Sequence, residues 1–154
     1  MRTWPYIVLG GGVLGLDRLA KALVFGGLAP GESLPLLGGV LKLTRVHNLG
    51  GAFGLLPQHR TVFLVVSGGI ALGLTLFLVL GLLPGRWLRL GGALLGAGAW
   101  GNLIDRLSWG YVLDFIQLPG FPVFNVADLA IVVGAGLLAL GLLWRGNGTA
   151  FRGA

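Results

Sequence analysis

The sequence predicts an α-helical integral membrane protein, a four-transmembrane-helix bundle with a small β-containing region in its extracytoplasmic loops. Composition is the first reason, because 55% of the 154 residues are hydrophobic and only 10% are charged. A soluble domain usually carries about 25% charged residues. The mean hydropathy of +0.90 therefore excludes both a soluble globular domain and a disordered chain. Long apolar segments are the second reason, since each membrane span needs about 20 apolar residues.

Four apolar segments predict a single membrane domain over residues 1–154. The expected spans lie at about 4–25, 61–83, 87–104 and 125–144, with outer loops at 26–60 and 105–124. The second segment carries no charge, whereas Asp17, Arg18 and Lys21 interrupt the first. Arg2 followed by an apolar stretch also fits a secretory signal peptide. No small-residue cleavage site follows it cleanly, so we expect a retained span.

Basic residues in the short loops predict the orientation of the bundle. Arg2, the turn 84–89 and the tail with Arg145 and Arg152 lie at one end, so we expect both termini in the cytoplasm. In the first outer loop, residues 26–39 are rich in Gly, Pro and Leu, and residues 40–47 alternate as a strand does. We expect a small sheet on the membrane face, with 26–39 as a candidate lid.

Charge and cysteine content exclude several classes of function. The net charge of +6 arises from eleven bases against five acids, and the bases are scattered without a basic stripe, so nucleic-acid binding is not expected. The absence of Cys excludes disulfides, thiolate metal sites and a cysteine nucleophile. The chain has no His-Glu-x-x-His pattern, so we do not expect a zinc peptidase.

Polar side chains inside the expected spans need partners, because a charge at mid-membrane costs about 2.5–3.5 kcal/mol. Asp17 and Lys21 lie four residues apart on one helical face. They either neutralise each other and anchor the first helix, or they help to form a polar pocket. Asn102 shares a face with Asp105 or Arg106 at the end of the third span. An ordinary helix end explains the two charges, but an Asn one turn inside the span points to a polar site.

Asp114 and Asp128 are the candidate catalytic groups. Asp114 lies in a β-like apolar run at 111–116, and the alternative for it is a solvated loop. If Asn125 caps the last helix, Asp128 is the third helical residue and can return a hydrogen bond to the cap, so capping is its alternative role. The turn at 119–122 can fold the two carboxylates toward each other. Two carboxylates that share a proton can act as general base and general acid.

Glycine recurs at four-residue spacing in three of the expected spans. The pairs are Gly11 and Gly15, Gly69 and Gly73, and Gly92 and Gly96. Small residues let helices approach closely in lipid, so we expect close packing within the bundle, with homodimerisation as the alternative.

Five motifs in order along the chain resemble those of bacterial lipoprotein signal peptidase (signal peptidase II), a family of four-span aspartic peptidases of the cytoplasmic membrane. They are Asp17 with Lys21, Asn-Leu-Gly-Gly-Ala-Phe-Gly at 48–54, Gly-Asn-Leu-Ile-Asp-Arg at 101–106, Val-Leu-Asp-Phe at 112–115 and Phe-Asn-Val-Ala-Asp at 124–128. The resemblance covers nearly the whole chain. Gly51 stands where the family usually has Ala.

The resemblance implies roles for particular residues. Asp114 and Asp128 would be the catalytic pair. The polar site would be lined by Asn48, Asn102, Arg106 and Asn125, supported by Asp17 and Lys21, with Asp105 pairing with a neighbouring base. The implied substrate is a prolipoprotein whose Cys carries diacylglycerol, cleaved just before that Cys at the outer face of the bacterial inner membrane. No cofactor is implied, and we expect a monomer in contact with membrane lipid.

Two other classes of function stay open from the residues alone. A proton-coupled transporter or channel subunit would use Asp17, Lys21 and Arg106, although the polar residues gather at one interface and no broken helix marks a midplane site. A non-catalytic scaffold protein would use the glycine pairs. A metal-dependent peptidase, with carboxylates binding a hard cation, is a variant of the first hypothesis.

Overall fold

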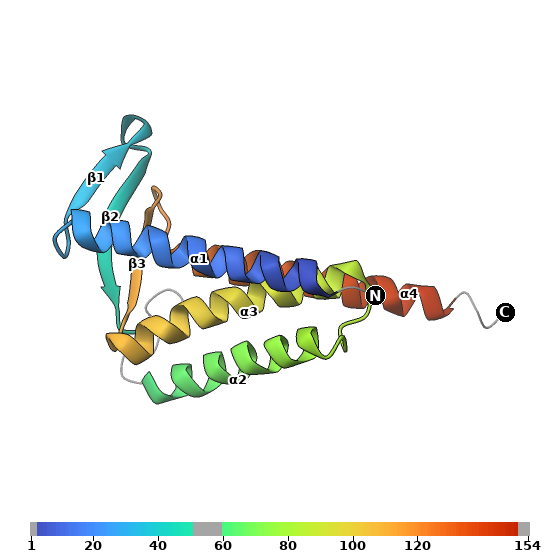
Figure 1. Cartoon of the computed structure of the whole chain (residues 1–154). Coiled ribbons are helices and arrows are strands. Elements are labelled where there is room, and N and C mark those ends of the chain that lie inside the picture. The colour runs from blue at the N-terminus through green and yellow to red at the C-terminus, as the bar shows by residue number, and fades with distance from the viewer. Residues whose placement is uncertain (1–2, 51–59, 151–154) are drawn as a thin grey trace.

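The computed structural model, which describes residues 3–50 and 60–150, contains four helices and a three-stranded sheet (Figure 1). The helices are α1 (Trp4–Gly27), α2 (Arg60–Val79), α3 (Gly85–Ser108) and α4 (Val126–Ala150). The strands are β1 (Ser33–Leu36), β2 (Leu41–Asn48) and β3 (Val112–Gln117), with a short 3₁₀ turn at Leu37–Gly39. The sheet lies at one end of the bundle, and the N-terminus of α1 and the C-terminus of α4 lie at the other.

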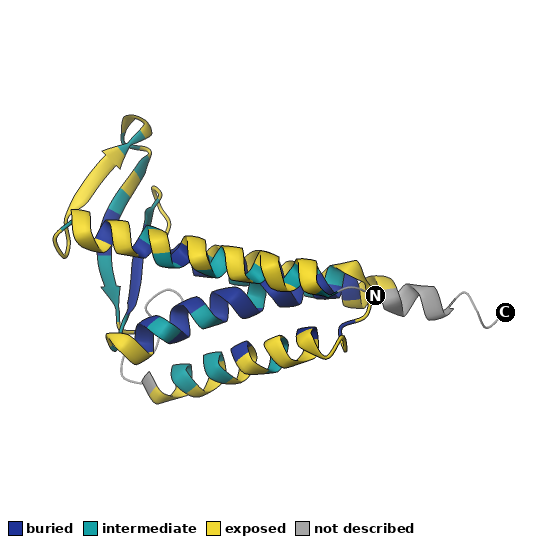
Figure 2. Cartoon of the chain, viewed as in Figure 1, coloured by how far each residue is buried: buried dark blue, intermediate teal, exposed yellow. Residues whose placement is uncertain are grey.

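Helix α3 is the centre of the bundle, because it packs against α1, α2 and α4. Figure 2 shows it buried over most of its length. Its small residues permit this approach: a Cβ at Gly98 would collide with the backbone of Ala127 in α4. The outer helices show the reverse of a soluble protein. Leu23, Val65 and Leu143 are about two-thirds exposed, at 68%, 69% and 68%, while Asp17 and Lys21 inside are 1% exposed.

Two helices of the described residues are long and apolar enough to cross a membrane. They contain Thr61–Val79 of α2 and Val126–Trp144 of α4. Helices α1 and α3 have sufficient length, at 24 residues each, but both carry charged side chains. Five of those charged side chains are buried, as ionisable groups in spans usually are, namely Asp17, Lys21, Arg89, Asp105 and Arg106. Arg18 is half-buried, and Arg86 at the start of α3 is exposed.

Two helices, α2 and α3, end several residues away from the ends of the spans expected at 61–83 and 87–104. Helix α2 ends at Val79 and not at residue 83, because Gly81 adopts a positive φ of 70° and the chain turns back. Leu82 N–H donates to the Phe77 carbonyl at 2.8 Å and Gly81 N–H donates to the Leu78 carbonyl at 3.2 Å, which is a Schellman cap. Helix α3 continues to Ser108, so residues 105–108 belong to the helix and not to the outer loop. The charges at 105 and 106 do not return to water there, since both side chains are buried.

The sheet confirms both strands that the sequence indicates. The run at 40–47 corresponds to β2, and the apolar run at 111–116 corresponds to β3. The strand order is β1-β2-β3 and both pairs are antiparallel. The register of β2 against β3 shifts between Leu43 and Val46, which is a β-bulge. Val46 thereby pairs with Asp114, so β2 sets the position of the first candidate acid.

The prediction that the three glycine pairs mark close helix packing within the chain is only partly correct. Gly92 and Gly96 do face neighbours, since a Cβ there would meet Leu83 and Leu74. The pairs Gly11 with Gly15 and Gly69 with Gly73 face open space within the chain. The tightest approaches to the backbone of a neighbouring helix are made by other glycines of α3 and α4, namely Gly91, Gly98 and Gly134. Spacing alone does not indicate which face of a helix turns inward.

Candidate active site

Asp114 lies in the middle of β3 with its carboxylate turned toward the start of α4. The side chain is buried, at 2% exposed. Asn48 Nδ2, at the end of β2, donates to Asp114 Oδ2 at 2.8 Å. Asn125 Nδ2, just before α4, donates to Asp114 Oδ1 at 2.7 Å. Both carboxylate oxygens therefore accept from neutral amides contributed by two different elements.

Asp128 lies in the first turn of α4 and takes the position that capping predicts. Asn125 Oδ1 accepts from Asp128 N–H at 2.8 Å, and Asn125 N–H donates to Asp128 Oδ2 at 3.2 Å. This is a reciprocal capping box. The other oxygen, Asp128 Oδ1, accepts from Asn102 Nδ2 at 2.7 Å. Capping and membership of the polar site are thus both true of Asp128.

Asn125 is hydrogen-bonded to both acids. Its amide nitrogen donates to Asp114, its amide oxygen and backbone N–H serve Asp128, and its side chain is fully buried. Asn102 Oδ1 accepts from Asn125 Nδ2 at 3.2 Å, which fixes the orientation of that amide. The turn between β3 and α4 therefore brings the two carboxylates of the sequence motif to one site.

The pKa of Asp114 is raised from 3.8 to about 7. Burial is the largest cause, because it disfavours the charged form, and the negative charge of Asp128 is the second. The hydrogen bonds from Asn48 and Asn125 favour the ionised form and oppose the shift. Near neutral pH this carboxyl can therefore hold or release a proton.

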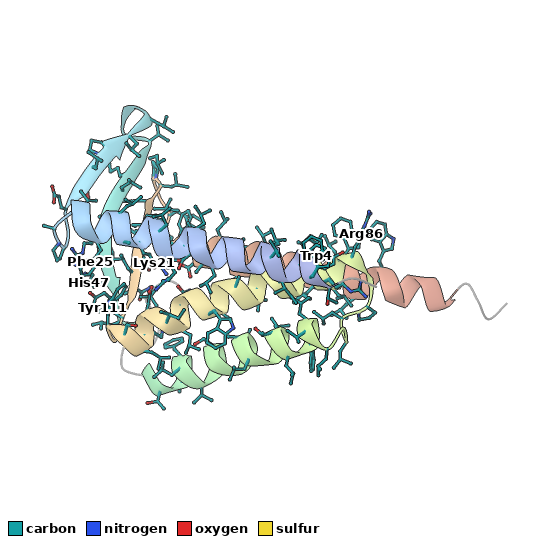
Figure 3. All side chains as sticks on the ribbon, viewed as in Figure 1. Trp4, Lys21, Phe25, His47, Arg86 and Tyr111 are labelled. Atoms are coloured by element: carbon teal, nitrogen blue, oxygen red, sulfur yellow. The ribbon has the colours of Figure 1, made fainter. Side chains whose placement is uncertain are left out.

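A second polar cluster lies next to the two acids, between α1 and α3. Lys21 Nζ lies 3.0 Å from Asp17 and 2.7 Å from Asp105, and Arg18 Nη2 lies 2.8 Å from Asp17 and 2.5 Å from Asp105. The Asp17–Lys21 pair expected from the spacing is confirmed, and Asp105 pairs with bases of α1. Figure 3 places Lys21 at the sheet end of α1. Lys21 Nζ also lies 3.4 Å from Asn102 Oδ1, which links this cluster to the acids.

The carboxylates of this cluster also anchor the two elements that carry the acids. Asp17 Oδ1 accepts from Ala127 N–H at 3.0 Å, and Asp105 Oδ2 accepts from Leu113 N–H at 3.2 Å. Ala127 and Leu113 are the residues immediately before Asp128 and Asp114. The cluster therefore fixes the backbone on which each acid is mounted.

Arg106 holds the segment that follows β2. Its Nη2 donates to the Gly50 carbonyl at 3.0 Å, and its guanidinium carbon lies 5.1 Å from the centre of the Phe63 ring. The motif residues Gly51, Ala52, Phe53 and Gly54 lie outside the described residues. Asp17, Lys21 and Arg106, on which a transporter would depend, are all engaged at the sheet end of the bundle.

The family model described as signal peptidase (SPase) II matches residues 9–144. The chain belongs to the signal peptidase II family. It is 46% identical over 140 residues to a lipoprotein signal peptidase of Moorella thermoacetica, covering 90% of this chain and 93% of that protein. It is 40% identical over 154 residues to one of Syntrophomonas wolfei, covering 96% of each.

A solved bacterial membrane enzyme superposes with a TM-score of 0.85 at 29% identity, covering 94% of this chain and 90% of that one. A second superposes with a TM-score of 0.79 at 30% identity, covering 90% and 92%. With the two apolar helices, these neighbours indicate a membrane protein, and membership of the signal peptidase II family indicates a peptidase.

Sequence reasoning missed three parts of the site. Arg18 bridges Asp17 and Asp105, and its position inside an apolar segment was a sufficient signal, since every charge there needs a partner. Gly101 is required because a Cβ would lie 2.8 Å from Asp17 Oδ2. The backbone groups of Leu113 and Gly50 carry no signal in the sequence.

Proposed function

We propose that this chain is an aspartic endopeptidase that removes the signal peptide from diacylglyceryl-modified prolipoproteins, cleaving just before the lipidated Cys. Membership of the signal peptidase II family supports the peptidase activity and the prolipoprotein substrate. One observation of the structure supports the two-acid mechanism. Asp114 and Asp128 are joined through Asn125, and within the described residues neither forms an ion pair with a cation.

In this mechanism Asp128 is the general base and Asp114 the general acid. Asp128 removes a proton from water, and the resulting hydroxide attacks the carbonyl carbon of the scissile peptide. Asp114, which holds a proton near neutral pH because its pKa is raised to about 7, donates that proton to the carbonyl oxygen. The proton taken by Asp128 then passes to the leaving nitrogen as the C–N bond breaks, and Asp114 takes back a proton from the gem-diol as the new carboxyl group forms.

The amides and bases around the acids have supporting roles in this proposal. Asn48, Asn102 and Asn125 hold the two carboxylates in fixed orientations through bonds of 2.8, 2.7 and 2.7 Å. Arg106 keeps the segment after β2 close to the site. Asp17, Lys21 and Asp105 act through the backbone and not on the substrate. No metal and no cofactor enters the reaction, so excess chelator leaves the rate unchanged.

The proposed setting is a four-span, single-domain monomer of the bacterial inner membrane, with both termini in the cytoplasm and the acids at the extracytoplasmic face. The exposed Leu and Val side chains of α1, α2 and α4 support four spans, because such faces are suited to lipid. Asp128 lies in the first turn of α4 and Asp114 in the strand just before it, so both acids lie at the sheet end of the bundle. A substrate held by its acyl chains and apolar signal helix presents its scissile bond at that depth.

The test is cleavage of a diacylated precursor by purified protein, followed as a gel shift. We expect Asp114→Asn and Asp128→Asn, made separately, each to lower the cleavage rate by a factor of about 10²–10⁴. Glu32→Gln is the matched control, because Glu32 is an exposed acid whose carboxylate caps the Ala29 N–H, far from the acid pair in sequence. Normal cleavage by either Asn variant at an intact protein level would refute the acid pair.

A further inference from the structure

Arg45 is a buried cation in β2 that no carboxylate neutralises within the described residues. Its side chain is 9% exposed. Burial of a charged group is costly unless hydrogen bonds compensate it. The partners of Arg45 therefore indicate what the residue does.

Arg45 is hydrogen-bonded to carbonyl groups at the C-terminal end of α1. Its Nη1 donates to the Phe25 carbonyl at 3.0 Å and to the Leu28 carbonyl at 2.9 Å, and its guanidinium carbon lies 3.9 Å from the centre of the Phe25 ring. The last turn of α1 contains no basic residue of its own. Arg45 thus supplies the positive group that the C-terminal carbonyls of a helix favour.

A series of stacked aromatic rings also connects β2 to the end of α1. Arg45 Nε donates to His47 Nε2 at 3.2 Å. The His47 ring stacks on Tyr111 at 4.0 Å between centroids, Tyr111 on Trp109 at 6.1 Å, and Trp109 on Phe25 at 5.5 Å. Figure 3 shows Phe25, His47 and Tyr111 gathered at the sheet end of α1. The series joins β2, the link between α3 and β3, and the end of α1.

Arg45 lies at the β-bulge of β2. Thr44 and Arg45 lie between Leu43 and Val46, where the register against β3 shifts, and both are buried. Bulges of this kind redirect side chains next to functional sites. Three residues further along β2, Asn48 donates to Asp114.

We propose that Arg45 is a positioning residue, which clamps β2 to the end of α1 and thereby holds the Asn48 amide on Asp114. The inference rests on the proposed function, because the Asn48–Asp114 contact affects cleavage only if Asp114 is catalytic. Without the clamp, the end of β2 drifts and the 2.8 Å bond lengthens. Hydrogen bonds weaken steeply once their geometry is lost.

Loss of the clamp should change the pKa of Asp114 in a definite direction. The charge of Asp128 raises the pKa of Asp114, while Asn48, Asn125 and Lys21 lower it. The positive charge of Arg106 also interacts with Asp114. Loss of the Asn48 bond therefore raises the pKa of Asp114 further above about 7. If Asp114 acts while protonated, the alkaline limb of the pH–rate profile moves to higher pH.

The experiment measures kcat and KM against pH for the full-length protein in detergent, using Arg45→Gln and the control Lys42→Gln. Lys42 is an exposed cation on the same strand, so both variants lose one positive charge. We expect Arg45→Gln to lower kcat by about tenfold, to shift the alkaline limb of the pH profile to higher pH and to leave KM unchanged, while Lys42→Gln matches wild type.

The variant Asn48→Ala should shift the alkaline limb in the same direction. Adding Arg45→Gln to Asn48→Ala should change the profile little, because the effects of coupled sites are not additive. A wild-type profile for Arg45→Gln, or full additivity with Asn48→Ala, would overturn the proposal.

A distance measurement separates this inference from the proposed function. The chain contains no Cys, so spin labels on Leu23→Cys in α1 and Lys42→Cys in β2 report one distance. We expect a narrow distribution with Arg45 present and a broad one in Arg45→Gln; an unchanged distribution would contradict the clamp. If Arg45→Gln does not fold, Arg45→Lys replaces it, with a smaller shift expected in both measurements and none if the inference is wrong. Cleavage by Asp114→Asn would refute the proposed function while leaving the distance result in place.

Discussion

Four of the five acids of this chain lie in one buried network, but they form two chemically different pairs. Asp17 and Asp105 each contact two cations, Arg18 and Lys21, at 3.0 Å or less. Asp114 and Asp128 accept hydrogen bonds from amides instead. The difference indicates a division of labour. The first pair is neutralised and holds the backbone, whereas the second forms no ion pair within the described residues and is the pair that we propose to carry the proton.

The largest expected effect falls on the second pair. Asp114→Asn or Asp128→Asn should lower the cleavage rate by a factor of about 10²–10⁴, the usual contribution of a general acid or base. The stability of Asp114→Asn should fall only modestly, since the one amide oxygen of Asn can still accept from either Asn48 or Asn125, although not from both. Thermal unfolding in detergent checks the fold, and cleavage of the diacylated precursor checks the rate. If a variant loses stability and cleavage together, the second pair of acids cannot be distinguished from the first by this test.

The first pair should show the opposite behaviour. Asp105→Asn leaves Arg18 and Lys21 with one buried carboxylate between them, and breaking a buried ion pair in this way costs about 3–5 kcal/mol. We expect a large fall in the free energy of unfolding, measured by denaturation in detergent. The double variant Asp105→Asn with Lys21→Met should be less destabilised than the single one, because the unpaired cation is removed. An Asp105→Asn protein that is stable but inactive would place Asp105 in the chemistry.

Much of this arrangement could be predicted from the residues. The Asp17–Lys21 pair follows from helical spacing, and the capping box of Asn125 and Asp128 follows from their three-residue separation. The strand carrying Asp114 follows from its apolar run. These features are local, so sequence distance is a good guide to them.

Contacts between distant elements could not be predicted in this way. Nothing near Arg18 or Asp105 in the sequence indicates that they meet across α1 and α3. The end of α2 was misplaced because hydropathy does not register the positive φ of Gly81. The continuation of α3 to Ser108 depends on partners of Asp105 that lie on another helix.

A smaller effect tests how closely the first pair is fitted. A Cβ at Gly101 would lie 2.8 Å from Asp17 Oδ2 and 2.9 Å from Ala127 Cβ. Gly101→Ala should therefore destabilise the protein by about 1–3 kcal/mol, the usual cost of overpacking. Gly15→Ala is the matched control, since its Cβ would meet nothing within 4 Å and Ala is the better helix former. Equal stability of the two variants would mean that Asp17 has room to move.

The pH dependence gives the smallest of these effects, about tenfold per pH unit at most. The pKa of Asp114 is raised to about 7, so its protonated form predominates below pH 7 and is lost above it. We expect cleavage to decline as pH rises through about 7, in the profile of kcat against pH. A rate that stays constant to pH 9 would mean that Asp114 does not act as the acid.

Infrared difference spectroscopy on the purified protein tests the contrast between the two pairs most directly, because a protonated carboxyl has its own C=O stretching band. We expect one such band below about pH 7 that vanishes in Asp114→Asn and remains in Asp105→Asn and Glu32→Gln. A band that persists in Asp114→Asn, or disappears in Asp105→Asn, would contradict the assignment of the proton to Asp114.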